Sequence, residues 1–214
     1  MELKKHKAYK LAFDIACNEL LATNIETQLV RAGLEYTVTN KVYTVTIPFF
    51  NDHITLTFPE CSFKSSHAHT VTLVTKIIIL HYILHASGIH VGDHKIPYED
   101  IPGCRSYAPV FTNRVIKPLL SAFGYSSHSF LEAGLSLNGN QEPYGNASFT
   151  LTPLPRIPIT FILWEGSYEF SPSLTILFDP SIHTYLPLED IVVIAKLTST
   201  RILKAARLHY QKED

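Results

Sequence analysis

The chain has 214 residues, of which 46% are hydrophobic, and this length suffices for one substantial core. Its 18 basic and 19 acidic residues give a formal net charge of -1, and neither kind forms a long run. Such a mixed surface lacks the basic patch with which proteins bind phosphate backbones. We therefore expect no nucleic-acid partner.

The cysteines and the amino terminus bear on the compartment. Cys17, Cys61 and Cys104 are far apart and form no CxxC pair, a pattern typical of reduced cytoplasmic thiols. The start, MELKKHKAYK, is charged and precedes an amphipathic stretch, unlike a secretory signal. The apolar segment 71–91 contains Lys76 and several histidines, which are costly to place in lipid, so it predicts a buried helix. We expect a cytoplasmic protein with no membrane partner.

The first part of the chain predicts a helix, a meander and a second helix. Apolar residues recur at helical spacing over residues 6–32, and Gly33 follows as a C-cap. Residues 35–58 alternate between apolar residues and threonines, which predicts a three-stranded antiparallel meander with one apolar face. The apolar segment 68–87 precedes Gly88 and predicts a helix that covers this face.

Helices flank a second β region in the rest of the chain. Residues 108–123 predict a helix that suits Pro109 in its first turn and that Pro118 bends or breaks. A last helix over residues 187–208 begins with acidic residues and ends with basic ones, in accord with the helix dipole. The strands expected between them are 149–151, 157–164 and 174–178.

The predicted fold class is α+β. The meander and the second antiparallel β region are expected to pack against helices on one side, within a single α+β domain spanning residues 1–214.

Four of the eleven histidines lie in the short stretch HYILHASGIHVGDH: His81, His85, His90 and His94. On a helix, His81 and His85 share a face, and imidazoles four residues apart can hold one metal ion. Tyr82 follows His81 where the HEXXH motif has glutamate, which excludes a zinc protease of that type. Three explanations stay open: a cofactor site for a tetrapyrrole or divalent metal, ordinary hydrogen bonding at a helix end, and a catalytic proton shuttle.

A second set of polar residues lies in and after the second β region: Arg156, Glu165, Glu169, Asp179, Glu189 and Asp190. Carboxylates at strand ends can act as acid and base, so Glu165, Glu169 and Asp179, together with Arg156, form a candidate hydrolase or transferase site, but charged residues at strand ends are usually only solvated. The start of the last helix also explains the two remaining carboxylates. No GxSxG, P-loop or GxGxxG motif is present, so the sequence assigns no enzyme class.

A family resemblance rests on seven short sequence segments: HYILHASG, IPGCRSY, KPLLSAFG, YGNASFTLTPLPRIPITFILWEG, YEF, ILFD and TYLPLED. Over about residues 81–190 the chain resembles domain-of-unknown-function family 3786, an uncharacterised prokaryotic family of anaerobic bacteria and archaea. Some similar proteins are joined to an iron–sulfur cluster segment, so the resemblance implies a neighbourhood of corrinoid and one-carbon metabolism. This sequence contains no such cysteine-rich segment, and it has Asn146 where the family pattern tends to have aspartate.

Three hypotheses for the function follow. The leading one is a cytoplasmic accessory protein that binds a small molecule or a metallocofactor (corrinoid, haem or metal), with His81, His85, His90 and His94 as its contacts. The alternatives are a hydrolase or transferase with a carboxylate and arginine site in the second β region, and a non-catalytic protein interaction module. The sequence leaves the ligand, the cofactor and the oligomeric state open.

Overall fold

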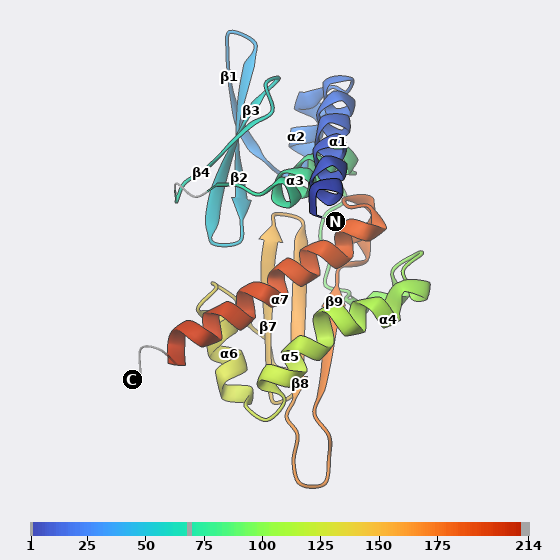
Figure 1. The fold of residues 1–214 in the computed structure, drawn as a ribbon, viewed down its shortest axis with the longest axis vertical. Helices are drawn as coiled ribbons and strands as arrows, with labels where there is room; N and C mark the ends of the chain where they lie inside the picture. Colours follow the sequence, from blue (N-terminus) through green and yellow to red (C-terminus); the bar gives the residue numbers. More distant parts are fainter. Residues whose placement is uncertain (1, 68–69, 211–214) are drawn as a thin grey trace. The chain divides into compact units, whose positions relative to one another are not determined.

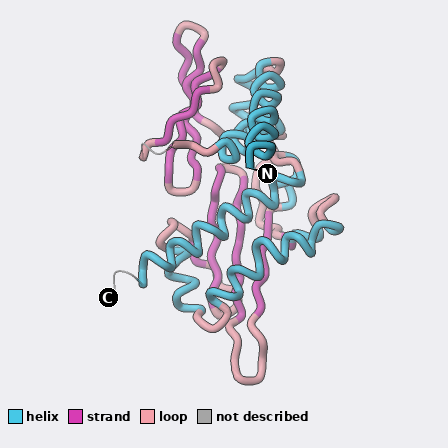
Figure 2. The backbone as a smooth tube through the Cα atoms, viewed as in Figure 1, coloured by secondary structure: helices cyan, strands magenta, loops and turns pink. Residues whose placement is uncertain are grey.

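The computed structural model describes residues 2–67 and 70–210. The chain divides into two compact units, each assembled from several stretches of sequence. The first unit comprises Met1–His90, Leu154–Arg156 and Thr184–Pro187, and the second comprises Val91–Pro153, Ile157–His183 and Leu188–Asp214. Each unit has its own antiparallel sheet with helices, which confirms the α+β class (Figure 2). A single domain over residues 1–214 stays a prediction.

The first unit combines helices with a four-stranded sheet of strand order β1-β2-β3-β4 (Figure 1). Its elements are α1 (Glu2–Leu21), α2 (Ile25–Ala32), β1 (Glu35–Thr39), β2 (Val42–Phe49), β3 (Asp52–Phe58), β4 (Ser62–Ser65) and α3 (Leu73–His85). All three strand pairs are antiparallel.

The first predicted helix is divided in two. Between α1 and α2, the Asn24 side chain accepts a hydrogen bond from the Thr27 N–H at 3.0 Å and caps a new helix. Gly33 ends α2 with a φ of 68°, the left-handed conformation expected of a C-cap. Helical spacing alone did not reveal the break, because apolar residues continue across it.

The meander has the apolar and threonine-lined faces that its sequence predicts. Along β2, Val45 and Ile47 are fully buried, and the threonines that alternate with them are exposed. The fourth strand, β4, was not predicted, because its sequence SFKS contains one apolar residue, Phe63. Lys76 of α3 lies 5.7 Å from the centroid of the Phe63 ring, and α3 also packs against α1 and α2.

The predicted apolar helix is shorter than expected. Thr72 caps it by accepting a hydrogen bond from the Thr75 N–H at 3.2 Å, and the helix has 13 residues. Residues 68 and 69 of the prediction lie outside the described residues. Among the described helices, none combines the length and the apolar character needed to cross a membrane.

The second unit is built on a five-stranded antiparallel sheet of order β5-β9-β8-β7-β6. Its main elements are β5 (Ile96–Pro97), α4 (Ala108–Phe111), α5 (Lys117–Phe123), α6 (Ser127–Leu135), β6 (Asn140–Gln141), β7 (Ala147–Leu154), β8 (Ile157–Trp164), β9 (Ser173–Phe178) and α7 (Leu188–Tyr210). Short 3₁₀ turns at Tyr98–Asp100, Arg105–Tyr107 and Pro180–Thr184 connect some of them.

Aromatic side chains join the helices to one face of this sheet. The ring centroids of Phe130 in α6 and Phe149 in β7 are 4.8 Å apart, and those of Phe111 in α4 and Phe178 in β9 are 6.0 Å apart. Figure 1 shows α5 and α7 lying across the same side of β7, β8 and β9. The helices of this unit therefore gather on one side of the sheet, as predicted.

The helix predicted over residues 108–123 contains a local defect before Pro118. A π-helical turn, Thr112–Ile116, joins α4 to α5, and within it the Lys117 N–H donates to the Thr112 carbonyl. Pro118 lacks an N–H, and its ring would clash with a carbonyl of the preceding turn in a regular helix. The wider turn removes this clash, so the bend expected at Pro118 takes the form of a π turn.

Candidate functional site

The four predicted histidine ligands are divided between the two units. His81 and His85 lie on α3, with ring centroids 6.0 Å apart and an interplanar angle of 65°. His90 follows this helix, and its Nδ1 lies 2.9 Å from Nη1 of Arg156. Because a guanidinium only donates, this imidazole nitrogen accepts the hydrogen bond. His94 belongs to the second unit and is exposed there.

A metal would need further ligands beside the His81–His85 pair. Among the described residues, no three His, Cys, Asp or Glu side chains lie close enough together to hold a metal ion. Two imidazoles supply half of the tetrahedral ligand set of a structural zinc site. Binding of a metal or a tetrapyrrole at these histidines stays a prediction.

The predicted carboxylates lie at different ends of the β8–β9 hairpin. Glu165 follows β8, and its Oε2 accepts a hydrogen bond from the Ser127 N–H at 3.1 Å, at the start of α6. Asp179 follows β9, and its two oxygens accept from the N–H groups of Gly92 and Ser181, each at 2.8 Å. The six residues of β9 separate the two ends by roughly 20 Å of extended chain.

The remaining members of this set have separate surroundings. Glu169 is exposed in the loop between β8 and β9, and Arg156 belongs to the first unit. Asp190 is buried in the first turn of α7. Glu189 in the same turn is exposed and lines a pocket. A hydrolase or transferase site built on the set stays a prediction.

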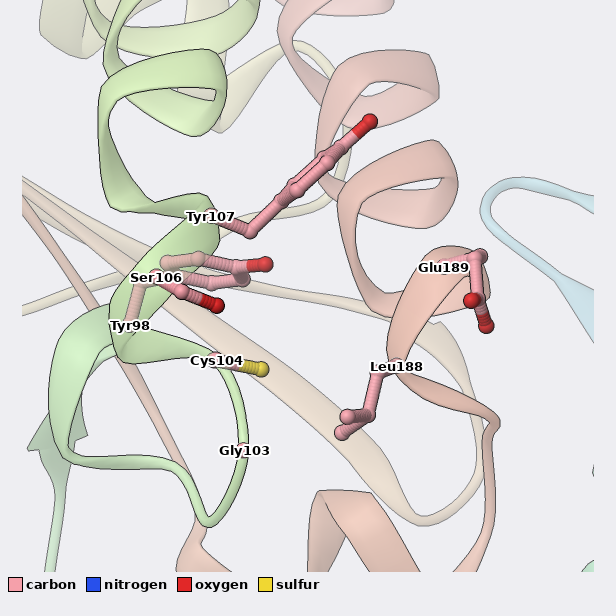
Figure 3. A pocket seen from close by; sticks show the side chains of 7 residues that line it. All are labelled: Tyr98, Gly103, Cys104, Ser106, Tyr107, Leu188 and Glu189. Atoms are coloured by element: carbon pink, nitrogen blue, oxygen red, sulfur yellow. The ribbon is translucent and has the colours of Figure 1, made fainter.

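This pocket has a volume of about 330 Å³ and lies within the second unit. We call it the tyrosine pocket; it is lined by Tyr98, Gly103, Cys104, Ser106, Tyr107, Leu188 and Glu189. Figure 3 shows Tyr98, Cys104 and Ser106 on one wall, with Leu188 and Glu189 at the start of α7 on the other. Two segments far apart in the sequence therefore form the pocket.

A glycine allows the two walls to approach. Gly103 lies between two 3₁₀ turns and has a φ of 85°, a conformation that glycine adopts without strain. A Cβ atom at this position would lie 2.7 Å from Cδ1 of Leu188. The loop can follow this path beside α7 because residue 103 has no side chain.

Tyr98 and Cys104 form the buried part of their wall of the pocket, with exposed fractions of 2% and 1%. The ring of Tyr98 stacks on Phe111 at a centroid distance of 4.1 Å, and its hydroxyl lies near the Cys104 thiol. Burial raises the pKa of both groups. The thiol therefore stays protonated at neutral pH and is a poor nucleophile.

Glu189 carries the one full charge among the seven lining residues. Its negative charge acts on Tyr98 and Cys104. Burial and other nearby groups affect the pKa of these two residues more strongly, and the charge of Glu189 raises both pKa values further. The hydroxyls of Ser106 and Tyr107 add hydrogen-bonding groups to the walls. The tyrosine pocket thus combines aromatic and aliphatic walls with an acidic rim.

Periodicity did not point to the tyrosine pocket. The sequence does contain one indication of the pocket. Most of its lining residues lie in the segments IPGCRSY and TYLPLED, and both segments contribute to the family resemblance. Neither segment contains a recognised ligand-binding or catalytic motif, so residue spacing could not predict that the two segments lie side by side.

Comparisons with known proteins bear on this resemblance. A search of curated proteins and a search of solved structures each found no significant match. A scan against protein families matched residues 24–201, a span that includes both walls of the tyrosine pocket. The chain belongs to the family described as Domain of unknown function (DUF3786).

Proposed function

We propose that this protein binds a small organic cation, an amine with an apolar body, in the tyrosine pocket. The observation that supports the proposal is a pocket of about 330 Å³ in which Glu189 is the one charged side chain among aromatic, aliphatic and hydroxyl groups. Such a combination of apolar walls with a few placed polar groups is typical of small-molecule sites.

The walls suit the apolar body of the ligand. Tyr107 and Leu188 are 41% and 38% exposed, which is a large fraction for apolar side chains that face a cavity. A ligand that covers them removes apolar surface from water, at about 25 cal/mol for each Å². The volume lies near the lower end of the range for ligand sites, which is about 300–1,000 Å³. We therefore expect a ligand of metabolite size.

The negative charge of Glu189 at the rim favours a positively charged ligand. An ammonium group can pair with Glu189, and the hydroxyls of Ser106 and Tyr107 on the opposite wall can form hydrogen bonds with other polar groups of a ligand. The amino terminus of α7 has the opposite, positive partial charge, but Glu189 and Asp190 in its first turn offset it. An anionic ligand would meet the carboxylate of Glu189 and be repelled.

Three probes of one shape test the proposal: phenethylamine, phenethyl alcohol and phenylacetate, titrated by NMR at low salt and about pH 7. We expect the amine to bind most tightly and the carboxylate least. In Glu189→Gln, the affinity for the amine should fall about twofold to fivefold, the range for an exposed ion pair, while the affinity for the alcohol stays the same. Equal binding of amine and alcohol to the wild type would contradict the proposal.

A pair of substitutions locates the binding. Ser106 is exposed and lines the pocket, so Ser106→Trp fills the cavity with little effect on folding. Glu99 is exposed on the neighbouring turn outside the lining, and Glu99→Trp is the matched control. Binding of phenethylamine should be lost in the first variant and kept in the second. Binding that survives in Ser106→Trp would place the amine elsewhere.

A further inference from the structure

A second pocket, of about 270 Å³, lies on the opposite face of the five-stranded sheet. Phe149 and Phe178 point toward the helices, where they contact Phe130 and Phe111. Because side chains alternate along a strand, their neighbours Thr150 and Asp179 point to the other face and line this pocket. We call it the threonine pocket, after the threonines of β7 and β8 that form its base.

A chain of hydrogen bonds crosses the threonine pocket. Nζ of Lys95 and Oγ1 of Thr150 both donate to Oε1 of Glu142, at 2.8 Å and 2.6 Å. The hydroxyls of Thr150 and Thr160 are 2.7 Å apart. Since the proton of Thr150 goes to Glu142, Thr160 must donate to Thr150. Hydrogen bonds from Lys95 and then Thr150 lower the pKa of Glu142, which holds its carboxylate ionised.

Several polar groups of this pocket keep unused hydrogen-bonding capacity. Lys95 has donors beyond the one given to Glu142, whose Oε2 has no hydrogen-bond partner among the described residues. Thr152 and Asn140 also line the pocket, and the described part of the chain offers their side chains no hydrogen bond. The side chains of Lys95 and Glu142 are 25% and 22% exposed, so these groups are accessible to a ligand.

Each charged group that lines the pocket already has partners. Lys95 and Glu142 pair with each other, and the oxygens of Asp179 accept hydrogen bonds from Gly92 and Ser181. An anionic ligand would compete with Glu142 for the ammonium group, and a cationic one would compete with Lys95 for the carboxylate. Either exchange would leave a partly desolvated charge without its partner, which is costly.

We propose that the threonine pocket binds a neutral, polyhydroxylated molecule of monosaccharide size. A hydroxyl group both donates and accepts, so one hydroxyl can donate to Oε2 of Glu142 while it accepts from Lys95. Neighbouring hydroxyls of the same ligand can then reach Thr152 and Asn140, which line the pocket. This site is separate from the tyrosine pocket and does not depend on the function proposed for it.

The first experiment compares neutral, anionic and cationic ligands of monosaccharide size. Glucose, galactose, mannose and myo-inositol serve as neutral probes, gluconate as the anion and glucosamine as the cation, each followed by NMR titration of the full chain. At least one neutral probe should bind, and the two charged probes should bind more weakly than their neutral parent. Failure of all four neutral probes to bind would overturn the proposal.

The charge pair provides a sharper test. Glu142→Gln keeps the shape of the side chain but leaves Lys95 without its counter-charge. The affinity for the neutral probe should fall at least about tenfold, because a hydrogen bond to a charged group is lost. The affinity for gluconate should rise, because the ammonium group becomes available to an anion. A variant that binds both probes as the wild type does would contradict the assigned role of Glu142.

Two tryptophan substitutions on the same face locate this binding. Thr152 is exposed and lines the pocket, so Thr152→Trp should abolish binding of the neutral probe. Thr175 of β9 faces the same side outside the lining, so Thr175→Trp should preserve it. Circular dichroism checks that each variant folds, and Asn140→Trp on the short strand β6 replaces Thr152→Trp if that variant does not fold. Unchanged binding in the folded pocket variant would overturn the proposal.

Discussion

Asp52 is an acidic side chain of the first unit that hydrogen bonds hold in its ionised form. It is 4% exposed, and it accepts hydrogen bonds from the hydroxyls of Ser66 and Ser65 at 2.6 Å and 2.8 Å. Desolvation alone would raise the pKa of this carboxyl. The hydrogen bonds from both serines, from His67 and from the backbone of His53 outweigh it and hold the pKa well below its usual range.

The stability of the protein should therefore depend on pH through Asp52. The folded pKa lies below the unfolded value of about 3.9, so this contribution is complete above the unfolded value and is lost as the pH falls toward the folded pKa. We expect Asp52→Asn to lower the free energy of unfolding by about 1–3 kcal/mol at neutral pH, and by less at about pH 3, where part of the contribution is already lost. Urea unfolding followed by circular dichroism measures both values.

Asp14 provides the control, because it is exposed on α1. Asp14→Asn should change the free energy of unfolding by less than about 0.5 kcal/mol. An Asp52→Asn variant whose unfolding free energy follows the wild-type pH dependence would show that the hydrogen bonds around Asp52 do not stabilise the fold.

At the scale of elements, α6 approaches the second sheet at a glycine. A Cβ atom on Gly134 would lie 2.4 Å from a ring carbon of Phe149 in β7. That ring is fully buried, with Phe130 and Phe161 at centroid distances of 4.8 Å and 5.6 Å. Because its neighbours hold it, the ring cannot move away without disturbing the core. The contact between α6 and β7 thus requires a residue without a side chain.

Substitution of Gly134 should accordingly destabilise the second unit. Alanine favours a helix over glycine by about 1 kcal/mol, but overpacking in a dense core costs about 1–3 kcal/mol and we expect it to dominate. Gly134→Ala should lower the urea midpoint of unfolding. In Gly92→Ala, whose Cβ would have its nearest neighbours at 4.0 Å, the midpoint should stay the same. A stabilised Gly134→Ala variant would show that α6 can shift away from β7.

At the scale of the whole molecule, the first unit depends on residues distant in the sequence. Tyr82 is fully buried, and its ring stacks on Tyr185 at a centroid distance of 5.7 Å. Its hydroxyl donates to the Ala32 carbonyl at 2.6 Å and accepts from the Arg156 N–H at 3.2 Å. Tyr185 donates in turn to the carbonyl of Ile89. The partners that complete this core arrive from the second half of the chain.

A fragment of residues 1–90 should therefore fold poorly by itself. Without the stretches 154–156 and 184–187 it exposes Tyr82 and leaves that side of the core open. We expect no cooperative urea transition for the fragment, in contrast to the full chain. Circular dichroism of both proteins under one set of conditions makes the comparison. A sharp transition in the fragment would show that these late segments are dispensable.

Sequence periodicity determined the features that depend on near neighbours along the chain. The alternation around Val45 and Ile47 predicted which face of the meander is buried, and Gly33 marked the end of a helix. The spacing of His81 and His85 likewise placed both on one side of α3. These features follow from the fixed repeats of helices and strands, because such a repeat determines which nearby residues share a face.

Tertiary structure alone decided which distant residues share a site. Cys104 and Glu189 line one pocket although 85 positions separate them, and Lys95 meets Glu142 across another. The carboxylates Glu165 and Asp179, assigned from the sequence to one candidate site, lie at opposite ends of the β8–β9 hairpin because its strands are antiparallel. Sequence periodicity indicates which face of a helix or strand is buried, but not the path of the backbone between elements. This path determines which distant side chains come together in a pocket.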